Sequence, residues 1–268
     1  MQKDIKKIKL FINNNDKSRE VAKILENKLI NNGFIICDET YDLAIAIGGD
    51  GSFLRMVKEN NFNSDIYYVG INAGTLGFLQ EIKINECDEF INDLKNNEFK
   101  VDYIGVQETN LYRKKECSKF YSLNEIVIRD KELNTTKLEV KIENDKLEDF
   151  IGDGLLISTS IGSTAYNLSF GGSIVYNSFN TLQITPIAPL NTKVYRSLVN
   201  SLIIPDNKEI VVIPKKEYKN LIITIDGENN IYDNVDYIKT FINNKRIKFL
   251  RLKHYNFPEK INEKFLND

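Results

Sequence analysis

Short apolar runs alternate with segments of helical spacing over the first hundred residues. In residues 16–33, Asp16 and Ser18 offer helix-capping side chains, and apolar residues then recur at helical spacing. Further helices are predicted over residues 52–59 and 87–94. Alternation of this kind predicts a parallel sheet with right-handed crossover helices. The runs that predict its strands are residues 8–12, 34–37, 43–47 and 67–71.

The pattern changes after about residue 99, where short runs of β-branched and aromatic residues recur. Two of them, residues 237–242 and 246–250, flank Asn243 and Asn244, and we expect a hairpin with these asparagines in its turn. This part of the chain is therefore predicted to be mostly β-sheet. The other runs that predict strands are residues 123–128, 138–142, 155–159, 210–213 and 221–225.

Together these patterns predict an α/β N-terminal domain with a parallel sheet, followed by a β-rich, sandwich-like C-terminal domain. We place the first domain at residues 1–98 and the second at residues 99–252. The polar tail, residues 253–268, is expected to form a helix that packs back on the first domain. No repeat or low-complexity linker separates the two domains.

Composition narrows the class of protein. Of the 268 residues, 42% are apolar and 28% are charged, which is typical of a globular protein. The net charge is -2, with basic and acidic residues interspersed, and this argues against a protein that binds DNA or RNA by its phosphates. No apolar stretch approaches the roughly 20 residues of a membrane span. No apolar signal region follows Met1, so we expect a soluble protein.

The cysteines and the histidine argue against two kinds of chemistry. Cys37, Cys87 and Cys117 are odd in number and far apart, so neither a disulfide framework nor a zinc site is expected. A reducing compartment, the cytoplasm, fits this pattern. His254 is the single histidine and lies in a charged C-terminal stretch, so we expect no nucleophile paired with histidine. If the chain is an enzyme, its base is expected to be a carboxylate.

Glycine is concentrated in two short regions. Of the 14 glycines, six lie in residues 48–77 and five in residues 152–172. Glycine lets a backbone approach a ligand closely or adopt a positive φ. Because each predicted domain has one cluster, we expect a ligand site in the cleft between the domains.

The first cluster, GGDGSFLR at residues 48–55, ends a predicted strand and opens a predicted helix. Strand carboxyl ends bind ligands in open α/β sheets, and a helix N-terminus suits a phosphate. Asp50 would repel a phosphate unless it acts through a cation or on an acceptor hydroxyl, and both are phosphoryl-transfer roles. Arg55, one turn later, could reach a phosphate oxygen. The residues alone also allow a tight turn in which Asp50 caps the helix.

Two other segments place glycine or polar residues at predicted strands. GINAGTLGFL, at residues 70–79, follows a buried strand and so lies at another strand carboxyl end. Asn124 and Glu125 interrupt an apolar strand run, and a polar pair there needs a partner or a ligand. The pair would suit the diol of a ribose. A structural hydrogen-bonded pair is the alternative.

The second glycine cluster, residues 152–172, has the sequence GDGLLISTSIGSTAYNLSFGG. A predicted strand runs into a hydroxyl-rich turn and then into a short helix. Tyr166 could stack on a base, and Thr164 and Ser169 could hydrogen-bond to a ribose. A serine- and threonine-rich loop on a β-sandwich is the structural alternative.

These segments together resemble the NAD kinases, in order and spacing, from about residue 42 to residue 214. The most specific part is ISTSIGSTAYNLSFGG following LNE at residues 123–125, since GGDG also occurs in diacylglycerol kinases and phosphofructokinases. The resemblance implies transfer of the γ-phosphate of ATP to the 2′-hydroxyl of the adenosine ribose of NAD, giving NADP. ATP is then the donor, and the expected cofactor is a divalent cation such as Mg²⁺, whose ligands the sequence does not identify.

The resemblance also implies roles for individual residues. Asp50 matches the catalytic aspartate, the base or orienter for the acceptor hydroxyl. Ala188 is expected near the NAD of a neighbouring subunit, in a homo-oligomer that is a dimer or a tetramer. The positions that match nucleotide- or NAD-binding residues are Gly51, Arg55, Phe78, Asn124, Glu125, Asp153, Thr164, Ala165, Tyr166 and Ser169.

The chain departs from the family at two places, and two other functions stay open. Ile161 stands where Thr or Ser is common, and Asp226, Gly227 and Glu228 match a later polar contact only loosely. One alternative is a lipid kinase of the diacylglycerol-kinase type, against which the hydroxyl-rich turn argues. The other is a nucleotide-binding sensor without turnover, against which the presence of Asp50 argues.

Overall fold

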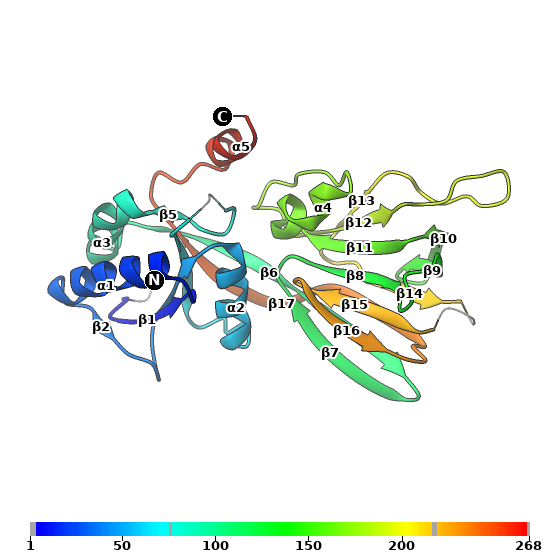
Figure 1. The fold of residues 1–268 in the computed structure, drawn as a ribbon, viewed down its shortest axis with the longest axis horizontal. Coiled ribbons are helices and arrows are strands. Elements are labelled where there is room, and N and C mark those ends of the chain that lie inside the picture. The colour runs from blue at the N-terminus through cyan, green and yellow to red at the C-terminus, as the bar shows by residue number, and fades with distance from the viewer. Residues whose placement is uncertain (1–3, 75–76, 216–218, 267–268) are drawn as a thin grey trace. The chain divides into compact units, whose positions relative to one another are not determined.

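A computed structural model describes residues 4–74, 77–215 and 219–266 of the chain. The chain divides into two compact units (Figure 1). The first consists of Met1–Ile104 together with Arg246–Asp268, and the second consists of Gly105–Lys245. The first unit is therefore assembled from both ends of the sequence.

The first unit contains the predicted alternation of strands and helices. Its strands follow the order β2-β1-β3-β4, and each neighbouring pair is parallel. The predicted α/β fold with a parallel sheet is confirmed. Its described elements are β1 (Lys7–Ile12), α1 (Asp16–Asn31), β2 (Ile35–Ile36), β3 (Leu43–Gly48), α2 (Asp50–Glu59), β4 (Tyr67–Asn72), β5 (Ile82–Lys83), η1 (Ile84–Glu86), α3 (Cys87–Asn96) and α5 (Phe257–Phe265).

Helices cover this sheet, which explains its continuous apolar strands. Every residue of β3 is buried. Leu43, Ile45 and Ile47 of β3 share one apolar cluster with side chains of α1 and α3, two helices that also contact each other. α2 packs against β3 as well, and its Phe53 meets Phe249 edge to face with ring centroids 4.8 Å apart. A parallel sheet covered by helices favours runs such as residues 43–47.

The start of α2 differs from the prediction in a way that matters for the site. The helix begins at Asp50 rather than at Ser52, with Gly49 as its N-cap. Asp50 therefore lies in the first helical turn. By contrast, α1 is capped by Asn15, whose side chain accepts a hydrogen bond from the Ser18 N–H at 2.8 Å.

The second unit is mostly β-sheet. One sheet has the order β13-β12-β11-β8-β15-β16, with antiparallel neighbours. The other contains β10, β9, β14, β17, β6 and β7. The bounds are β6 (Lys100–Arg113), β7 (Glu116–Ser122), β8 (Glu125–Asp130), β9 (Thr136–Ile142), β10 (Asp145–Gly152), β11 (Gly154–Thr159), η2 (Ile161–Thr164), α4 (Tyr166–Ser169), β12 (Thr181–Ile187), β13 (Leu202–Pro205), β14 (Ile210–Pro214), β15 (Leu221–Ile225), β16 (Glu228–Tyr232) and β17 (Tyr237–Arg251).

Side chains from both sheets form the core of the second unit. Ile126 and Ile157 of the first sheet share one buried apolar cluster with Val140 and Val212 of the second. The predicted β-rich, sandwich-like fold is confirmed. Several strands were not predicted, among them β7 and β16, because their residues are largely polar and few of them are buried.

The predicted hairpin around Asn243 and Asn244 is wrong. β17 runs without interruption through both residues, and neither has the positive φ that a two-residue hairpin turn requires. The first part of β17 pairs antiparallel with β14, and its last part pairs in parallel with β4. These strand partners hold the segment extended, so tertiary pairing overrides a local turn signal.

The polar tail contains α5, which begins near Pro258, a residue that suits a first helical turn. Residues 267 and 268 of the predicted tail lie outside the described residues. Within the described parts of the chain, no helix is both long enough and apolar enough to span a membrane.

Substitutions of Asn244 can test whether the segment is a strand or a hairpin turn. The residue is exposed, and the two conformations favour different residue types. Asn-Gly is a favoured hairpin turn, whereas glycine weakens the interior of a strand. We expect Asn244→Gly to lower the free energy of unfolding by about 0.5–1 kcal/mol, measured by urea denaturation. Asn244→Thr, with a strand-forming residue, is the control and should not lose stability. A more stable glycine variant would contradict the continuous strand.

Candidate active site

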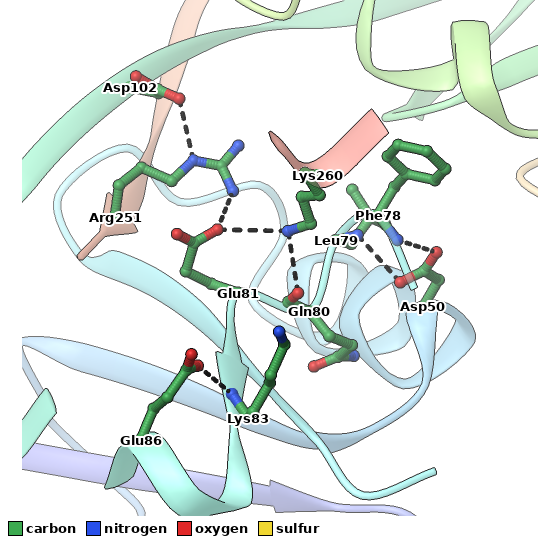
Figure 2. A network of polar contacts seen from close by, with 10 residues as sticks. All are labelled: Asp50, Phe78, Leu79, Gln80, Glu81, Lys83, Glu86, Asp102, Arg251 and Lys260. Atoms are coloured by element: carbon green, nitrogen blue, oxygen red, sulfur yellow. Dashed lines mark hydrogen bonds and ion pairs between the residues drawn. The ribbon is translucent and has the colours of Figure 1, made fainter. Parts of the chain in front are cut away.

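The carboxylate of Asp50 is held by the backbone of a neighbouring loop. Its Oδ2 accepts a hydrogen bond from the Phe78 N–H at 2.9 Å, and its Oδ1 accepts one from the Leu79 N–H at 3.0 Å (Figure 2). Asp50 is also the first residue of α2, where the helix dipole is positive. The carboxylate is therefore oriented through both oxygens, and each oxygen keeps a lone pair for another partner.

Gly77 allows this loop to approach Asp50. A Cβ atom at residue 77 would collide with the Asp50 carboxylate, so only glycine permits the contact. Gln80 adds a further tie, because its side-chain amide donates to the Gly49 carbonyl at 2.6 Å. Residues 77–80 thus hold the GGDG loop at three points.

Phe78 contributes its backbone to Asp50 and its ring to another contact. The ring lies against Phe265 of α5, with centroids 5.2 Å apart. Thr75 and Leu76, which complete the predicted GINAGTLGFL motif, lie outside the described residues. The described part of the motif therefore acts as a support for Asp50.

Gly51 and Arg55 lie on the exposed side of α2. The N-cap Gly49 provides no capping side chain, and the Ser52 N–H already donates to the Gly49 carbonyl at 2.9 Å. The N–H groups of Asp50 and Gly51 are therefore the ones that an anion can use. The Arg55 guanidinium donates to the Ile12 carbonyl at 3.3 Å and lies 3.7 Å from the Glu59 carboxylate. Exposed ion pairs of this kind are weak, so a phosphate could take over the guanidinium.

In the second unit, Asn124 and Glu125 are buried with unsatisfied oxygens. Asn124 is only 7% exposed and Glu125 only 6%. The Oδ1 of Asn124 and the Oε2 of Glu125 have no hydrogen-bond partner among the residues that the structure describes. A buried polar atom without a partner costs about 1–3 kcal/mol. These open acceptors argue for a ligand over the structural pair that the sequence also allowed.

Asp226 supports the backbone of this pair. Its carboxylate accepts hydrogen bonds from the N–H groups of Leu123 at 2.7 Å, Asn124 at 2.8 Å and Glu125 at 3.2 Å. Asp226 matches the family pattern only loosely in the sequence. The available signal was an acidic residue directly after the apolar run of residues 221–225.

The carboxyl groups of Glu125 and Asp226 both have raised pKa values. Burial, with a smaller contribution from Asp226, raises the pKa of Glu125 to about 8. Burial also raises the pKa of Asp226 to about 6, although three backbone N–H groups oppose that shift. At neutral pH Glu125 is thus largely protonated. A neutral carboxyl group both donates and accepts, which suits a hydroxyl ligand.

The hydroxyl-rich turn packs directly on Asn124. The Thr159 hydroxyl donates to the Leu123 carbonyl at 2.6 Å, and the Thr159 N–H donates to the Asn124 carbonyl at 2.8 Å. At Gly162 a Cβ atom would collide with that same Asn124 carbonyl. The structure thus brings Asn124, Glu125 and the turn together within the second unit.

Tyr166 stands in an exposed aromatic and basic cluster. Its ring meets Phe170 edge to face, with centroids 4.7 Å apart. The Arg129 guanidinium donates to the Tyr166 hydroxyl at 3.0 Å and lies 5.8 Å and 5.9 Å from the two ring centroids. Arg129 was not among the predicted site residues, because a lone Arg after an apolar strand run gives no functional signal. The cluster offers a ring face and a cation to a ligand.

The remaining predicted residues are also accessible on the second unit. Thr164 and Ala165 are partly exposed in the turn, and Ser169 is exposed at the end of α4. Asp153 is exposed between β10 and β11, and its N–H donates to the Ile187 carbonyl at 3.0 Å. Ala188 follows β12, is exposed and has a φ of 44°. Their contacts with a nucleotide stay predictions.

The described residues include no group of three or more His, Cys, Asp or Glu side chains that could hold a metal ion. Mg²⁺ often takes most of its ligands from phosphate oxygens and water. Asp50 is the carboxylate that the GGDG loop offers to such a cation.

Comparison with protein families identifies the chain. The model of the ATP-NAD kinase N-terminal domain matches residues 8–99, and that of the ATP-NAD kinase C-terminal domain matches residues 123–252. The chain belongs to the NAD kinase family. The resemblance drawn from the motifs is thereby confirmed.

Individual NAD kinases match over nearly their whole length. The NAD kinase of Finegoldia magna is 40% identical, covering 99% of this chain and 100% of the relative. That of Latilactobacillus sakei is 31% identical, covering 97% of each chain. Yeast NADH kinase complexed with NADH has a TM-score of 0.88 at 20% identity, covering 100% of this chain and 90% of that chain. An NAD kinase from Archaeoglobus fulgidus in complex with ATP has a TM-score of 0.74 at 18% identity, covering 97% and 96%. These two structures show the shared fold.

The pKa of Glu125 predicts a pH-dependent stability. From its ordinary value of 4.5 up to about 8, Glu125 keeps its proton in the folded chain and loses it in the unfolded chain. The free energy of unfolding therefore falls as pH rises through this window. We expect Glu125→Gln to remove this loss, so that the variant is about 1–3 kcal/mol more stable than wild type at pH 8.

Urea denaturation at pH 5 and pH 8 measures this difference. Glu132→Gln, which removes an exposed carboxylate from the same unit, is the matched control and should follow wild type. The burial argument would be wrong if Glu125→Gln and wild type showed the same change in stability between the two pH values.

Proposed function

We propose that this chain is an NAD kinase, which transfers the γ-phosphate of ATP to the 2′-hydroxyl of the adenosine ribose of NAD and produces NADP. The observation that carries the proposal is the Asp50 carboxylate, oriented by two backbone N–H groups at the start of α2. Relatives named NAD kinase, at 31% and 40% identity over nearly the full chain, support the same reaction.

The loop around Asp50 suits the phosphoryl donor. The N-terminus of α2 attracts phosphate oxygens through its N–H groups and its dipole. The exposed Gly51 leaves room beside them, and Arg55 can exchange its contact with the Ile12 carbonyl for a phosphate oxygen. A divalent cation held by the phosphates would neutralise negative charge on the transferred phosphoryl group.

Asp50 acts on the acceptor hydroxyl. Its carboxylate takes the proton from the 2′-hydroxyl as the 2′-oxygen forms a bond to the γ-phosphorus. The bond from the γ-phosphorus to the bridging oxygen breaks, and its electrons leave with ADP. The N–H groups of Phe78 and Leu79 keep the carboxylate in place throughout, so no reorientation is needed during the transfer.

We assign recognition of NAD to the polar cluster of the second unit. The unsatisfied oxygens of Asn124 and Glu125 can accept hydrogen bonds from ribose hydroxyls. Tyr166 offers an aromatic ring to a base. The further residues that we assign to NAD are Asp153, Thr164, Ala165 and Ser169, which are exposed or partly exposed.

The two alternative functions explain these features less well. A lipid acceptor would leave the buried oxygens of Asn124 and Glu125 without donors, which is costly. A sensor without turnover would not require a carboxylate oriented as Asp50 is. The family matches over both parts of the chain also favour an NAD kinase.

We further propose a homo-oligomer, a dimer or a tetramer, in which Ala188 lies near the NAD of a neighbouring subunit. The segment after Ala188 exposes apolar side chains, among them Val194 at 79% and Val199 at 55% exposure. Clustered exposed apolar residues are typical of protein–protein contacts.

We also propose a cytoplasmic location. Cys37, Cys87 and Cys117 are free thiols. Unpaired cysteines suit a reducing compartment.

A coupled assay tests the function. Purified protein is incubated with ATP, Mg²⁺ and NAD, and NADP is measured with an NADP-specific dehydrogenase. We expect NADP to appear only when all three are present. No NADP from the wild-type protein would refute the proposal, and phosphorylation of diacylglycerol in place of NAD would support a lipid kinase.

Asp50→Asn tests the base. The amide keeps the size of the side chain but cannot take a proton at neutral pH, and its NH2 group cannot accept one of the two backbone hydrogen bonds. We expect the variant to fold and bind NAD as wild type does, and to lose roughly 10²- to 10⁴-fold in kcat. Thermal unfolding and NAD titration serve as controls, and near-normal turnover would rule out Asp50 as the base.

Ala188→Tyr tests the contribution of a neighbouring subunit. A bulky side chain close to a partner's NAD should cost about 1–3 kcal/mol by overpacking, which raises the Kd for NAD about 5- to 150-fold. Calorimetry measures the Kd, and thermal unfolding should show an unchanged fold. Glu132→Tyr, at an exposed position of the same unit, is the control. An unchanged Kd in the Ala188 variant would argue against the shared site.

A further inference from the structure

Lys260 is a buried cation on the C-terminal helix α5. The residue is 8% exposed. Its Nζ donates to the Gln80 carbonyl at 2.9 Å and lies 3.3 Å from the Glu81 carboxylate (Figure 2). A buried ammonium group is costly unless it is paired and hydrogen-bonded. Packing of the amphipathic helix α5 alone would favour an apolar side chain at this position.

The backbone that Lys260 binds belongs to the loop that holds Asp50. Phe78 and Leu79 donate their N–H groups to the Asp50 carboxylate, and the Gln80 side chain donates to the Gly49 carbonyl. Lys260 binds the carbonyl of the next residue in this series, Gln80. Lys260 thus contacts the residue that directly follows Leu79, one of the two donors that orient the Asp50 carboxylate (Figure 2).

Glu81 anchors the same loop to two other elements of the first unit. Its Oε2 lies 2.9 Å from the guanidinium of Arg251 on β17, a residue that is 3% exposed. Arg251 in turn donates to Asp102 of β6 at 2.9 Å. Asp102 and Arg251 belong to strands, so this side of the network is attached to the sheet, whereas Lys260 attaches it to α5.

Electrostatics agree with this arrangement. The pKa of Lys260 is lowered, chiefly by burial and also by the positive charge of Arg251, while the negative charge of Glu81 opposes the shift. The neutral partner, the Gln80 carbonyl, has no competing side-chain donor among the contacts of the described residues.

We propose that Lys260 is a positioning residue for Asp50, holding residues 78–80 at the place from which their donors orient the catalytic carboxylate. The inference rests on the proposed role of Asp50. Lys260 itself touches no reacting atom. This role would make the C-terminal helix α5 a support of the catalytic carboxylate, although Lys260 and Asp50 are 210 residues apart in sequence (260 − 50).

Lys260→Met removes the hydrogen bond and the charge while keeping most of the side-chain volume. Small displacements of catalytic groups cost up to about 10²-fold in rate, so we expect kcat to fall roughly 10- to 100-fold. KM for NAD and for ATP should change by no more than about twofold, because substrate contacts are untouched. Lys264→Met makes the same change at an exposed position of α5 and should retain wild-type kcat.

A double-mutant cycle separates positioning from general stability. If Lys260 acts through Asp50, Lys260→Met should lower kcat by less than about twofold in the Asp50→Asn background. An equal loss of kcat in both backgrounds would overturn the positioning role. The role of Asp50 fails by a different result, namely near-normal turnover of Asp50→Asn alone.

A second variant keeps the test decisive if Lys260→Met does not fold. Lys260→Gln retains a donor for the Gln80 carbonyl without a buried charge, and we expect a smaller loss of kcat that is again absent in the Asp50→Asn background. Circular dichroism and thermal unfolding establish the fold of each variant. Wild-type kcat in a folded Lys260→Gln and a folded Lys260→Met would overturn the proposal.

Discussion

The hydrogen bonds from the Phe78 and Leu79 N–H groups to the Asp50 carboxylate are the constraint on which the first unit's site depends. They require α2 to begin at Asp50, directly after β3, and they require the segment after β4 to return to that point. Parallel neighbours bring the carboxyl ends of β3 and β4 to the same edge of the sheet. The glycine at residue 77 is then the consequence of this close approach, since a side chain there would displace the carboxylate.

The second unit meets a different constraint. Asn124 and Glu125 stay buried although one oxygen of each lacks a partner within the described parts of the chain, and this costs stability. Asp226 holds their backbone by three hydrogen bonds, and the turn at Gly162 closes on the Asn124 carbonyl. The structure thus maintains a polar pair in an unfavourable state, as proteins commonly do where a ligand completes the hydrogen bonding.

The chain forms the first unit from its N-terminal part and, after the second unit, from its C-terminal part as well. β6 and β17 each contribute residues to both units, and α5 follows β17. The polar network around Glu81 joins four segments that are distant in sequence: the loop of residues 77–81, β6, β17 and α5. The C-terminal helix α5 therefore belongs to the unit that carries Asp50.

The sequence by itself determined the α/β and β-rich halves, the strands at residues 43–47 and 67–71, and the family, because periodicity and glycine-rich motifs are local properties. It also singled out Asp50, Asn124 and Glu125 as chemically unusual residues in their surroundings. Only the tertiary structure decided that residues 237–251 form one strand, that Asp226 supports Asn124 and Glu125, and that Lys260 reaches the Asp50 loop. The physical reason is the same in each case. These contacts are made to backbone N–H and carbonyl groups, which every residue at those positions presents alike, so side-chain identity carries no record of them.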